Sequence, residues 1–556
     1  MRSVAQVVAA GGVPAPQEFV APDVDWVAMW PVTAVLAAAV LGVLVEAFVP
    51  RAARRGAQLV LALAGLLVAG VGVVVLWRSV TQTGRSRAAV SYPETFGSTS
   101  MLLDEVSLFL QGSLVVMSVL AVLTMAERVS GRLEAFAPQA SAVPGSAYEK
   151  QAYAAGLSQT EVFPLTMFAV GGMMVFSASA DLLTMFVALE VFSLPLYILC
   201  GLARRRRLLS QEASLKYFLL GAFSSAIFLF GIAFMYGITG TVSLVGMGQQ
   251  LTALTQGQAD LAGLAQQLPI VVVAVVMVLV GLLFKVGAVP FHAWTPDVYT
   301  GAPTAVTGFM AACTKLAAFG ALVRVLYQGV APLQEMWQPV VWVVAAATMV
   351  FGAVVVILQD DIKRILAYSS IAHAGFILTG FAALGSSGIA GILFYVLAYG
   401  LSTVAAFGIV ALVREHEADG SISGEATHLS QWAGLGRRSP VVAGAFSLLM
   451  LAYAGIPLTS GFTAKFGVFS AAVETGHTWL AIVGVVASAV TAFVYVRVIV
   501  LMYFTEPEPG SVRGTVLGVG PLVAVAVALG VAATLVLGVL PSPFLDLAGA
   551  VAVAGR

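Results

Sequence analysis

Long apolar segments alternate with short polar connections along almost the whole chain. A membrane-spanning helix needs about 20 predominantly apolar residues, and we count fourteen segments that meet this need. They cover residues 26–48, 57–78, 102–126, 160–180, 181–203, 214–239, 268–290, 301–328, 337–358, 366–385, 387–413, 439–475, 479–504 and 515–540. Only residues 179–181 separate the fourth from the fifth, which predicts a tight hairpin. The pattern predicts an all-α polytopic membrane protein.

Two of the segments are expected to be broken helices. Residues 441–473 are nearly continuously apolar, and as a straight helix they would extend roughly 50 Å, against a hydrocarbon core of about 30 Å. They contain GIPLTSG at 455–461. Because proline interrupts a helix, we expect a break near Pro457. The seventh segment resembles it, with Pro290 at its end and Pro296 beyond.

Composition supports the membrane assignment and excludes several function classes. The chain is 60% hydrophobic and only 10% charged, where soluble domains carry about 25% charged residues. The net charge is zero, so charge does not indicate a nucleic-acid or other anionic partner. Cys200 and Cys313 lie in apolar segments without a CxxC motif, so we expect no disulfide, zinc or iron–sulfur site. Residues 1–25 lack a signal-peptide core, so we expect no cleaved signal.

The basic residues in the loops predict the orientation of the chain. With fourteen spans, one set of alternate loops holds sixteen Lys and Arg residues, and the other set with both tails holds five. Because short cytoplasmic loops are enriched in Lys and Arg, the basic set is expected in the cytoplasm and both termini outside. An odd number of spans would mix the two sets, so the segregation favours fourteen.

Lysine is used differently from arginine. The chain has 21 arginines and six lysines, and four of the lysines lie within apolar segments: Lys216, Lys285, Lys315 and Lys465. Arginine stays charged in essentially any protein environment, whereas a buried lysine can release its proton. An ionisable residue at membrane depth is a functional hypothesis by default. We therefore interpret these lysines as proton-carrying candidates, although Lys216 lies near a span end, where a lysine can also extend to the interface.

Few other ionisable groups accompany these lysines. Glu190 is the one acid well inside a predicted span, and a carboxylate there is expected to be paired or protonated. His373 is a possible relay group or a residue satisfied at a helix contact. His292 is a second possible relay, or it caps backbone that Pro290 leaves free. One acid cannot neutralise several lysines, so a purely structural role does not account for the set.

Six motifs resemble one known family. They are ALEVFSLPLYILCG, EASLKYFLLGAFSSAIFLFG, FKVGAVPFHAWTPDVYTGAPT, TKLAAFGALVRV, DDIKRILAYSSIAHAGF and GIPLTSGFTAKFGVF, in this order between about residues 160 and 475. This series resembles the antiporter-like membrane-arm subunits of the proton-pumping NADH–quinone oxidoreductase, respiratory complex I. KYFLLGAFSSA and the lysine at 465 make it most similar to bacterial subunit N, the counterpart of mitochondrial subunit 2.

The resemblance implies a fold and a set of roles. Two inverted five-helix repeats would cover residues 160–328 and 329–504, with broken helices seven and twelve. Residues 1–25 would be an external stretch, 26–126 three helices, 127–159 a cytoplasmic loop, and 505–556 the last helix with an external C-terminus. Residues 1–25 and 127–159 look longer than the family minimum.

The resemblance also implies a mechanism. Glu190 would pair with Lys285, and weakening that pair would send a proton to Lys315 and then out through Lys465, with Lys216 as a further site residue. NADH, flavin, iron–sulfur clusters and quinone would be bound by partner subunits and none by this chain. The other membrane-arm subunits and the lipid bilayer of a bacterial plasma membrane would be its partners.

Three alternatives remain open from sequence. The superfamily core is shared with multisubunit cation/proton antiporters and membrane-bound hydrogenases. Broken helices also suit an independent secondary transporter, although a row of lysines without a matched substrate pocket argues against one. A purely structural scaffold is least compatible with the sorting of lysine from arginine.

Overall fold

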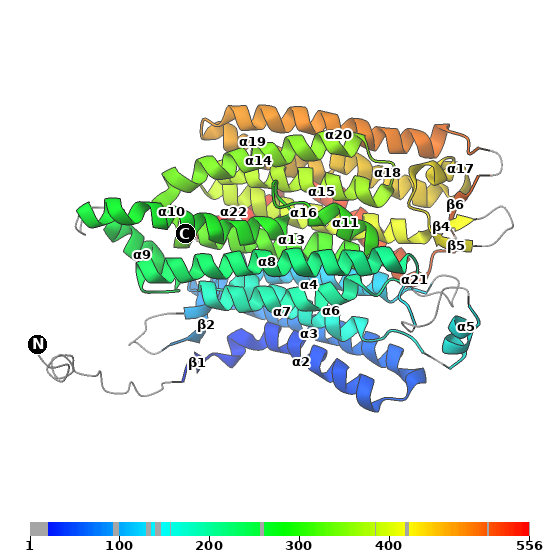
Figure 1. The fold of residues 1–556 in the computed structure, drawn as a ribbon, viewed down its shortest axis with the longest axis horizontal. Coiled ribbons are helices and arrows are strands. Elements are labelled where there is room, and N and C mark those ends of the chain that lie inside the picture. The colour runs from blue at the N-terminus through cyan, green and yellow to red at the C-terminus, as the bar shows by residue number, and fades with distance from the viewer. Residues whose placement is uncertain are drawn as a thin grey trace, which may run out of the picture.

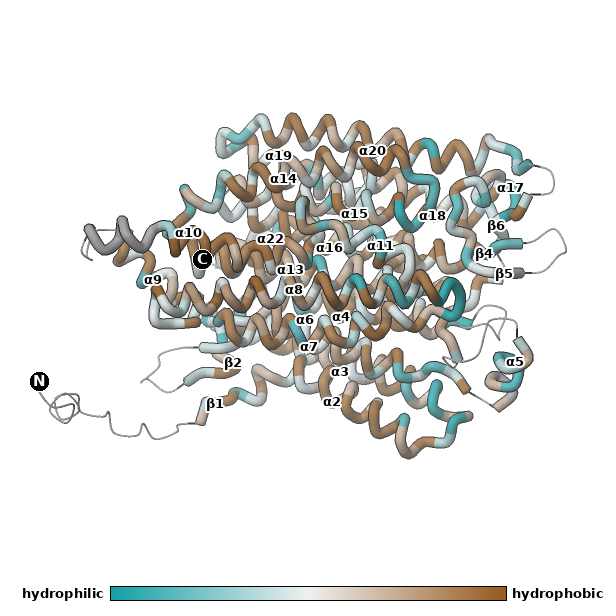
Figure 2. Tube along the Cα trace, viewed as in Figure 1, coloured by the Kyte–Doolittle hydropathy of each residue, from teal (hydrophilic) through white to brown (hydrophobic). Residues whose placement is uncertain are grey.

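The chain forms a bundle of long helices that run side by side (Figure 1). The computed structural model describes residues 21–92, 99–128, 135–138, 146–155, 157–255, 261–383, 385–416, 422–508, 511–516 and 518–554. Within that part, twelve helical spans are at least 18 residues long and apolar enough to cross a membrane. Hydrophobic residues cover most of their length, and the polar residues gather toward the two ends of the bundle (Figure 2).

Every predicted span has a helical counterpart. The first eight are α2 (Trp26–Phe48), α3 (Arg51–Thr83), α4 (Glu105–Met125), α6 (Val162–Ala178), α7 (Leu182–Cys200), α8 (Arg207–Thr239), α10 (Leu261–Val286), and α12 (Thr304–Phe309) continuing through η1 (Met310–Thr314), α13 (Lys315–Arg324) and η2 (Val325–Gly329). The next six are α14 (Gln334–Ile357), α15 (Ile362–Leu378) continuing into η4 (Thr379–Ala382), α16 (Ser386–Leu412), the pair α18 (Pro440–Ala454) and α19 (Ser460–Glu474), α20 (Thr478–Phe504) and α21 (Pro521–Val539).

Aspartates begin several of these helices. The carboxylate of Asp181 accepts a hydrogen bond from the backbone N–H of Thr184, which starts α7 directly after α6. Asp361 caps α15 through the N–H groups of Lys363 and Arg364. Such caps satisfy donors that the first helical turn leaves without partners. The predicted hairpin at residues 179–181 is confirmed, since only three residues separate the two helices.

Both predicted breaks are confirmed. The twelfth span divides at Gly455, whose φ of 83° ends α18, and α19 starts at Ser460. The seventh ends at Gly287, with φ of 75°, and turns continue to α11 (Trp294–Gly301). Glycine accepts this left-handed conformation, which a side chain disfavours. Each break therefore contains a glycine in addition to the proline that predicts it.

Additional elements lie at the two ends of the bundle (Figure 1). At one end are the antiparallel sheet β1 (Asp23–Val24), β2 (Arg87–Ser91) and β3 (Thr99–Leu103) and the helix α9 (Leu244–Thr255). At the other end are α5 (Ala147–Ala154), η5 (Leu429–Trp432), α17 (Leu435–Arg438) and a sheet of order β5 (Ile422–Glu425), β4 (Val413–His416), β6 (Arg513–Val516). The remaining elements are η3 (Ala331–Leu333) and α22 (Ser542–Ala554).

The centre of the bundle is formed by the eighth, tenth and eleventh spans. All of the apolar window in Thr304–Gly329 is buried, and 94% of the windows in Ile362–Ala382 and Ser386–Leu412. The outer spans are much less buried, for example 28% in Pro521–Val539. Polar side chains on the central helices are therefore shielded from the surroundings of the bundle.

Candidate functional site

Lys285 is buried in the last turn of α10, just before the break. Its side chain is 2% exposed, and its Nζ donates a hydrogen bond to Ser193 Oγ on α7 at 2.7 Å. The ammonium also lies over the rings of Phe192, Tyr197 and Tyr217, 5.3 to 5.6 Å from their centroids. Cation–π contacts stabilise an ammonium without neutralising it. Lys285 thus sits in an aromatic cage with a hydroxyl as its hydrogen-bond partner.

Glu190 lies one turn before Ser193 on α7 but does not pair directly with Lys285. In the part of the chain that the structure describes, no ion pair within 4.0 Å joins the two, and Glu190 Oε1 is buried without a hydrogen-bond partner. The direct pair that the resemblance implied is therefore absent from this arrangement. Ser193 is the hydrogen-bond partner of Lys285 instead, and a hydroxyl three residues after the acid was the available sequence signal for it.

Lys315 begins α13 in the centre of the bundle. Its side chain is 3% exposed, and its Nζ donates a hydrogen bond to the backbone carbonyl of Ser370 on α15. The ring of Tyr399 on α16 lies 5.5 Å from the ammonium. The π-helical turn Met310–Thr314 directly precedes this lysine. Such turns are often found at functional sites, and the sequence offered no signal for this one.

Lys465 lies at the second break. Its Nζ donates to the backbone carbonyls of Tyr453 and Ala454, at 2.7 and 3.1 Å, and to Ser488 Oγ at 2.7 Å. These carbonyls belong to the last turn of α18, where a helix leaves its acceptors without partners. The break therefore supplies the hydrogen-bond acceptors for the ammonium, which is 5% exposed.

His373 lies on α15 between Lys315 and Lys465. Its Nδ1 is 2.8 Å from the hydroxyl of Tyr395, and its Nε2 is buried with no partner among the described residues. The rings of Tyr399 and Tyr453 lie beside it, with centroids at 4.8 and 5.4 Å. A cavity of about 10 Å³ borders His373 and the start of α19, which is close to the space one water molecule requires. His373 therefore connects the surroundings of Lys315 with those of Lys465.

Aromatic rings connect the surroundings of Lys285 with those of Lys315. Tyr217, which contacts Lys285, is stacked on Trp294 with centroids 4.6 Å apart. Trp294 contacts Tyr299 at 6.2 Å, and the Tyr299 hydroxyl is 3.5 Å from Ser370 Oγ. Ser370 is the residue whose carbonyl accepts from Lys315. The three lysines thus belong to one continuous polar and aromatic layer through an otherwise apolar bundle.

Lys216 lies at the margin of this layer, next to Tyr217, in a charged cluster with Asp297, Glu212 and Arg364. Its Nζ is 2.7 Å from Asp297 and 2.6 Å from Glu212, and Asp297 also contacts Arg364 at 3.1 Å. The Lys216 side chain is 40% exposed. Burial raises the pKa of the Asp297 carboxyl, but hydrogen bonds from Lys216 and Arg364 outweigh burial and hold the pKa below its usual value.

His292 and Lys363 are placed differently from each other. His292 lies in the first break with its ring against Phe351, and its Nδ1 has no partner among the described residues. Lys363, one of the basic residues counted in the loops, lies in the first turn of α15, which Asp361 caps. It is 2% exposed and donates to the Ala302 carbonyl at 2.7 Å.

Cys200 and Cys313 are free and buried. Among the described residues, no group of three or more His, Cys, Asp or Glu side chains could hold a metal ion.

Comparison with known proteins gives the class and then the family. Residues 179–491 match the family model described as "NADH:quinone oxidoreductase/Mrp antiporter, TM". NADH-quinone oxidoreductase subunit N of Beutenbergia cavernae is 56% identical over 537 residues, covering 95% of this chain and 98% of that protein. Subunit N of Rhodococcus opacus is 52% identical over 553 residues, covering 96% and 97%.

Solved structures agree with these relatives. A chain of respiratory complex I from Thermus thermophilus with bound aureothin is 29% identical, with a TM-score of 0.70 over 93% of this chain and 99% of that one. A chain of the Mrp complex from Dietzia has a TM-score of 0.74 over 94% and 97%, but at 24% identity it shows the fold alone. This chain belongs to the family of NADH–quinone oxidoreductase subunit N, the antiporter-like, proton-translocating membrane subunits of complex I.

Proposed function

We propose that this chain moves protons across the membrane along the buried layer from Lys285 through Lys315 to Lys465. The observation that carries the proposal is the chemistry of their partners. Among the described residues, no carboxylate lies within 4.0 Å of any of the three Nζ atoms, and hydroxyl and carbonyl oxygens accept their hydrogen bonds. A buried cation held only by neutral groups is costly, and losing its proton removes that cost.

The proton release must be driven. Moving one charge against the membrane potential costs about 2.3 kcal/mol per 100 mV. The chain is a subunit of a proton-pumping oxidoreductase, and the drive would come from transfer of electrons from NADH to quinone in the partner subunits. We assign NADH, flavin, iron–sulfur clusters and quinone to those partners. The other membrane-arm subunits and the lipid bilayer surround this chain.

Glu190 is proposed to control the protonation of Lys285 through Ser193. A carboxylate near a buried ammonium favours the charged lysine. A shift of α7 that brings the carboxylate toward or away from Lys285 would therefore favour uptake or release of a proton. Ser193 Oγ accepts from Lys285 and donates to the Leu189 carbonyl, in the same turn of α7 as Glu190.

His373 is proposed as the relay between Lys315 and Lys465. It is held by Tyr395 through one ring nitrogen and leaves the other available, as a proton relay requires. The cavity beside it has room for about one water molecule. A relay role for His292 stays a prediction. Lys216 is proposed to position Asp297, with which it is paired.

The orientation and internal organisation are part of the proposal. The end carrying β4–β6 also carries Arg204 to Arg207, Arg414 and Arg513, and basic loops are typically cytoplasmic. In a bacterial plasma membrane both termini would then lie outside. Residues 160–328 and 329–504 would form two inverted repeats, each with one broken helix. Residues 1–20, 129–134, 139–145 and 156 lie outside the described part of the chain, and we assign no function to residues 1–25 or 127–159.

The test is Lys285→Ala in the assembled complex, with NADH oxidation and proton uptake measured in the same vesicles. We expect the complex to assemble and pumping to fall at least tenfold, which is the low end of what a positioned acid–base group contributes. Lys150→Ala is the matched control, because Lys150 is an exposed lysine on α5. If Lys285→Ala assembles and pumps and oxidises NADH at wild-type rates, the role given to Lys285 is wrong.

A further inference from the structure

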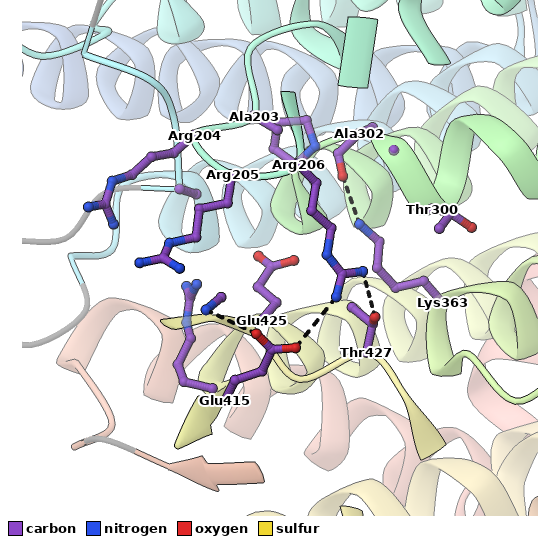
Figure 3. Close-up of a pocket in the computed structure, with 15 residues that line it drawn as sticks. Ala203, Arg204, Arg205, Arg206, Thr300, Ala302, Lys363, Glu415, Glu425 and Thr427 are labelled. Atoms are coloured by element: carbon purple, nitrogen blue, oxygen red, sulfur yellow. Dashed lines mark hydrogen bonds and ion pairs between the residues drawn. The ribbon is translucent and has the colours of Figure 1, made fainter. Parts of the chain in front are cut away.

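A charged pocket at the proposed cytoplasmic end is not used by the proton path. It has a volume of about 300 Å³ and is lined by five parts of the chain that are far apart in sequence. These are Ala135 in the connection before α5, the α7–α8 connection, the end of α11 with the residues after it, the start of α15, and β4–β5 with the residues after them (Figure 3). At about 30 Å³ of liquid per water molecule, it has room for a small polyatomic ion and several waters.

The lining is predominantly cationic. Five basic side chains line the pocket, against two carboxylates: Arg204, Arg205, Arg206, Lys363 and Arg414, with Glu415 and Glu425. Arg204 forms a bidentate ion pair with Glu149, which lies outside the lining, at 2.7 and 3.0 Å. A surplus of positive charge remains after this pair. Figure 3 shows Arg206 extending toward Glu415 and Thr427, and Lys363 toward the Ala302 carbonyl.

The two carboxylates are already engaged. Glu415 accepts from Gln431 Nε2 at 3.0 Å and the Gly424 N–H at 3.3 Å, and lies 3.5 Å from Arg206. Glu425 accepts a hydrogen bond from the neutral Thr304 hydroxyl and keeps its charge, which acts on both Lys363 and Arg414. Glu415 is engaged by Arg206, so one carboxylate remains for these two cations.

Two cations lack a carboxylate partner of their own. Lys363 donates to the Ala302 carbonyl, a neutral acceptor. Arg414 Nε is buried with no hydrogen-bond partner among the described residues. Burial lowers the pKa of the Arg414 guanidinium, and Arg204 and Arg205 lower it further, while Glu425 acts in the opposite direction. Arginine nevertheless stays charged, so the single carboxylate of Glu425 acts on two cations, Lys363 and Arg414.

We propose that this pocket binds a phosphate-type oxyanion, with Arg414 and Lys363 as direct ligands beside Arg206. A tetrahedral oxyanion accepts several charge-assisted hydrogen bonds at once, and the planar guanidinium fork matches its oxygens. The anion would contact segments that are far apart in sequence and so couple the α7–α8 and α11–α12 connections to α15 and β4. Two sources share this chemistry: inorganic phosphate of the cytoplasm and the headgroup of an anionic lipid.

The experiment is an electron cryo-microscopy map of the assembled complex in two preparations. One contains delipidated complex with inorganic phosphate, and the other contains complex in phosphatidylglycerol nanodiscs without free phosphate. An isolated tetrahedral density in the first identifies free phosphate, and density continuous with acyl chains in the second identifies the lipid. A pocket that holds only water in both preparations overturns the proposal.

Variants make the test quantitative. Arg414→Gln is expected to raise the phosphate or lipid concentration needed for half occupancy about ten- to hundredfold, the usual effect of losing a charged hydrogen bond. Arg414→Lys keeps the charge and serves if the glutamine variant does not assemble; it should lose less. Arg437→Gln removes an exposed arginine paired with Glu506 at 2.9 Å, and should leave occupancy unchanged. Wild-type occupancy in both Arg414 variants contradicts the site.

Discussion

The two ends of α13 carry two buried cations that are held in different ways. Arg324, at the last residue, lies 2.6 Å from the carboxylate of Asp104 and donates to the Ser177 carbonyl at 2.8 Å. Lys315, at the first residue, has a neutral carbonyl and an aromatic ring beside it. Arginine keeps its charge and is matched with a carboxylate, whereas lysine can lose its proton and is left without one. The comparison separates a structural cation from a functional one.

The largest effect is expected from replacing Arg324, the cation that is paired with a carboxylate. Arg324→Ala leaves the buried Asp104 carboxylate without its counter-ion, which typically costs 3–5 kcal/mol. Asp104 also caps α4 in a capping box with Ser107. We expect the subunit to be lost from the assembled complex, measured by its abundance and by thermal unfolding. Arg497→Ala, which removes an exposed pair with Asp360, should cost less than about 1 kcal/mol.

The next largest effect is expected on proton pumping when Lys465 is replaced. Lys465→Gln can still donate to the carbonyls at the break but carries no transferable proton. We expect assembly to be retained and proton pumping to fall at least tenfold, as measured by proton uptake in vesicles during NADH oxidation. Ser488→Ala, which removes one hydrogen bond and keeps the ammonium, should have a smaller effect. Equal losses in the two variants would show that packing at the break, and not the proton, is what matters.

A smaller effect is expected at the relay. His373→Gln keeps a polar side chain near the Tyr395 hydroxyl but lacks a group that gains and loses protons near neutral pH. Pumping should fall severalfold while assembly is unchanged. Tyr395→Phe tests the support of the ring and should lose less. Wild-type pumping by His373→Gln would return this residue to the satisfied helix contact that the sequence also allowed.

The smallest effect is expected at Lys216. Its pairs with Asp297 and Glu212 are partly exposed, and such pairs contribute about 0–1 kcal/mol. Lys216→Ala should therefore assemble normally and pump within about twofold of the wild type. A loss as large as that of Lys285→Ala would place Lys216 in the proton path itself, as the sequence reading had it.

The spans and breaks could be predicted because they follow from local features of the chain. Apolar length marks each span, and excess length with Pro457 or Pro290 marks each break. The resemblance carried by the motifs around the lysines also indicated the family correctly. These features depend on composition along a continuous segment, so a single sequence contains them.

The partners of the site residues could not be predicted, because they come from distant segments. Lys285 and Ser193 are 92 residues apart, and Lys315 and Ser370 are 55 apart. The resemblance implied that Glu190 pairs with Lys285, and in the structure the hydrogen-bond acceptor of Lys285 is Ser193. Lys363 was counted with the loop residues, and in the structure it is buried in the first turn of α15.

The most direct test of the account is Lys315→Arg in the assembled complex. Arginine keeps the positive charge and the donor to the Ser370 carbonyl, but it does not release its proton. The account predicts normal assembly with proton pumping reduced at least tenfold, as measured by proton uptake per NADH oxidised in sealed vesicles. Pumping at the wild-type ratio in this variant would contradict the claim that Lys315 must give up its proton.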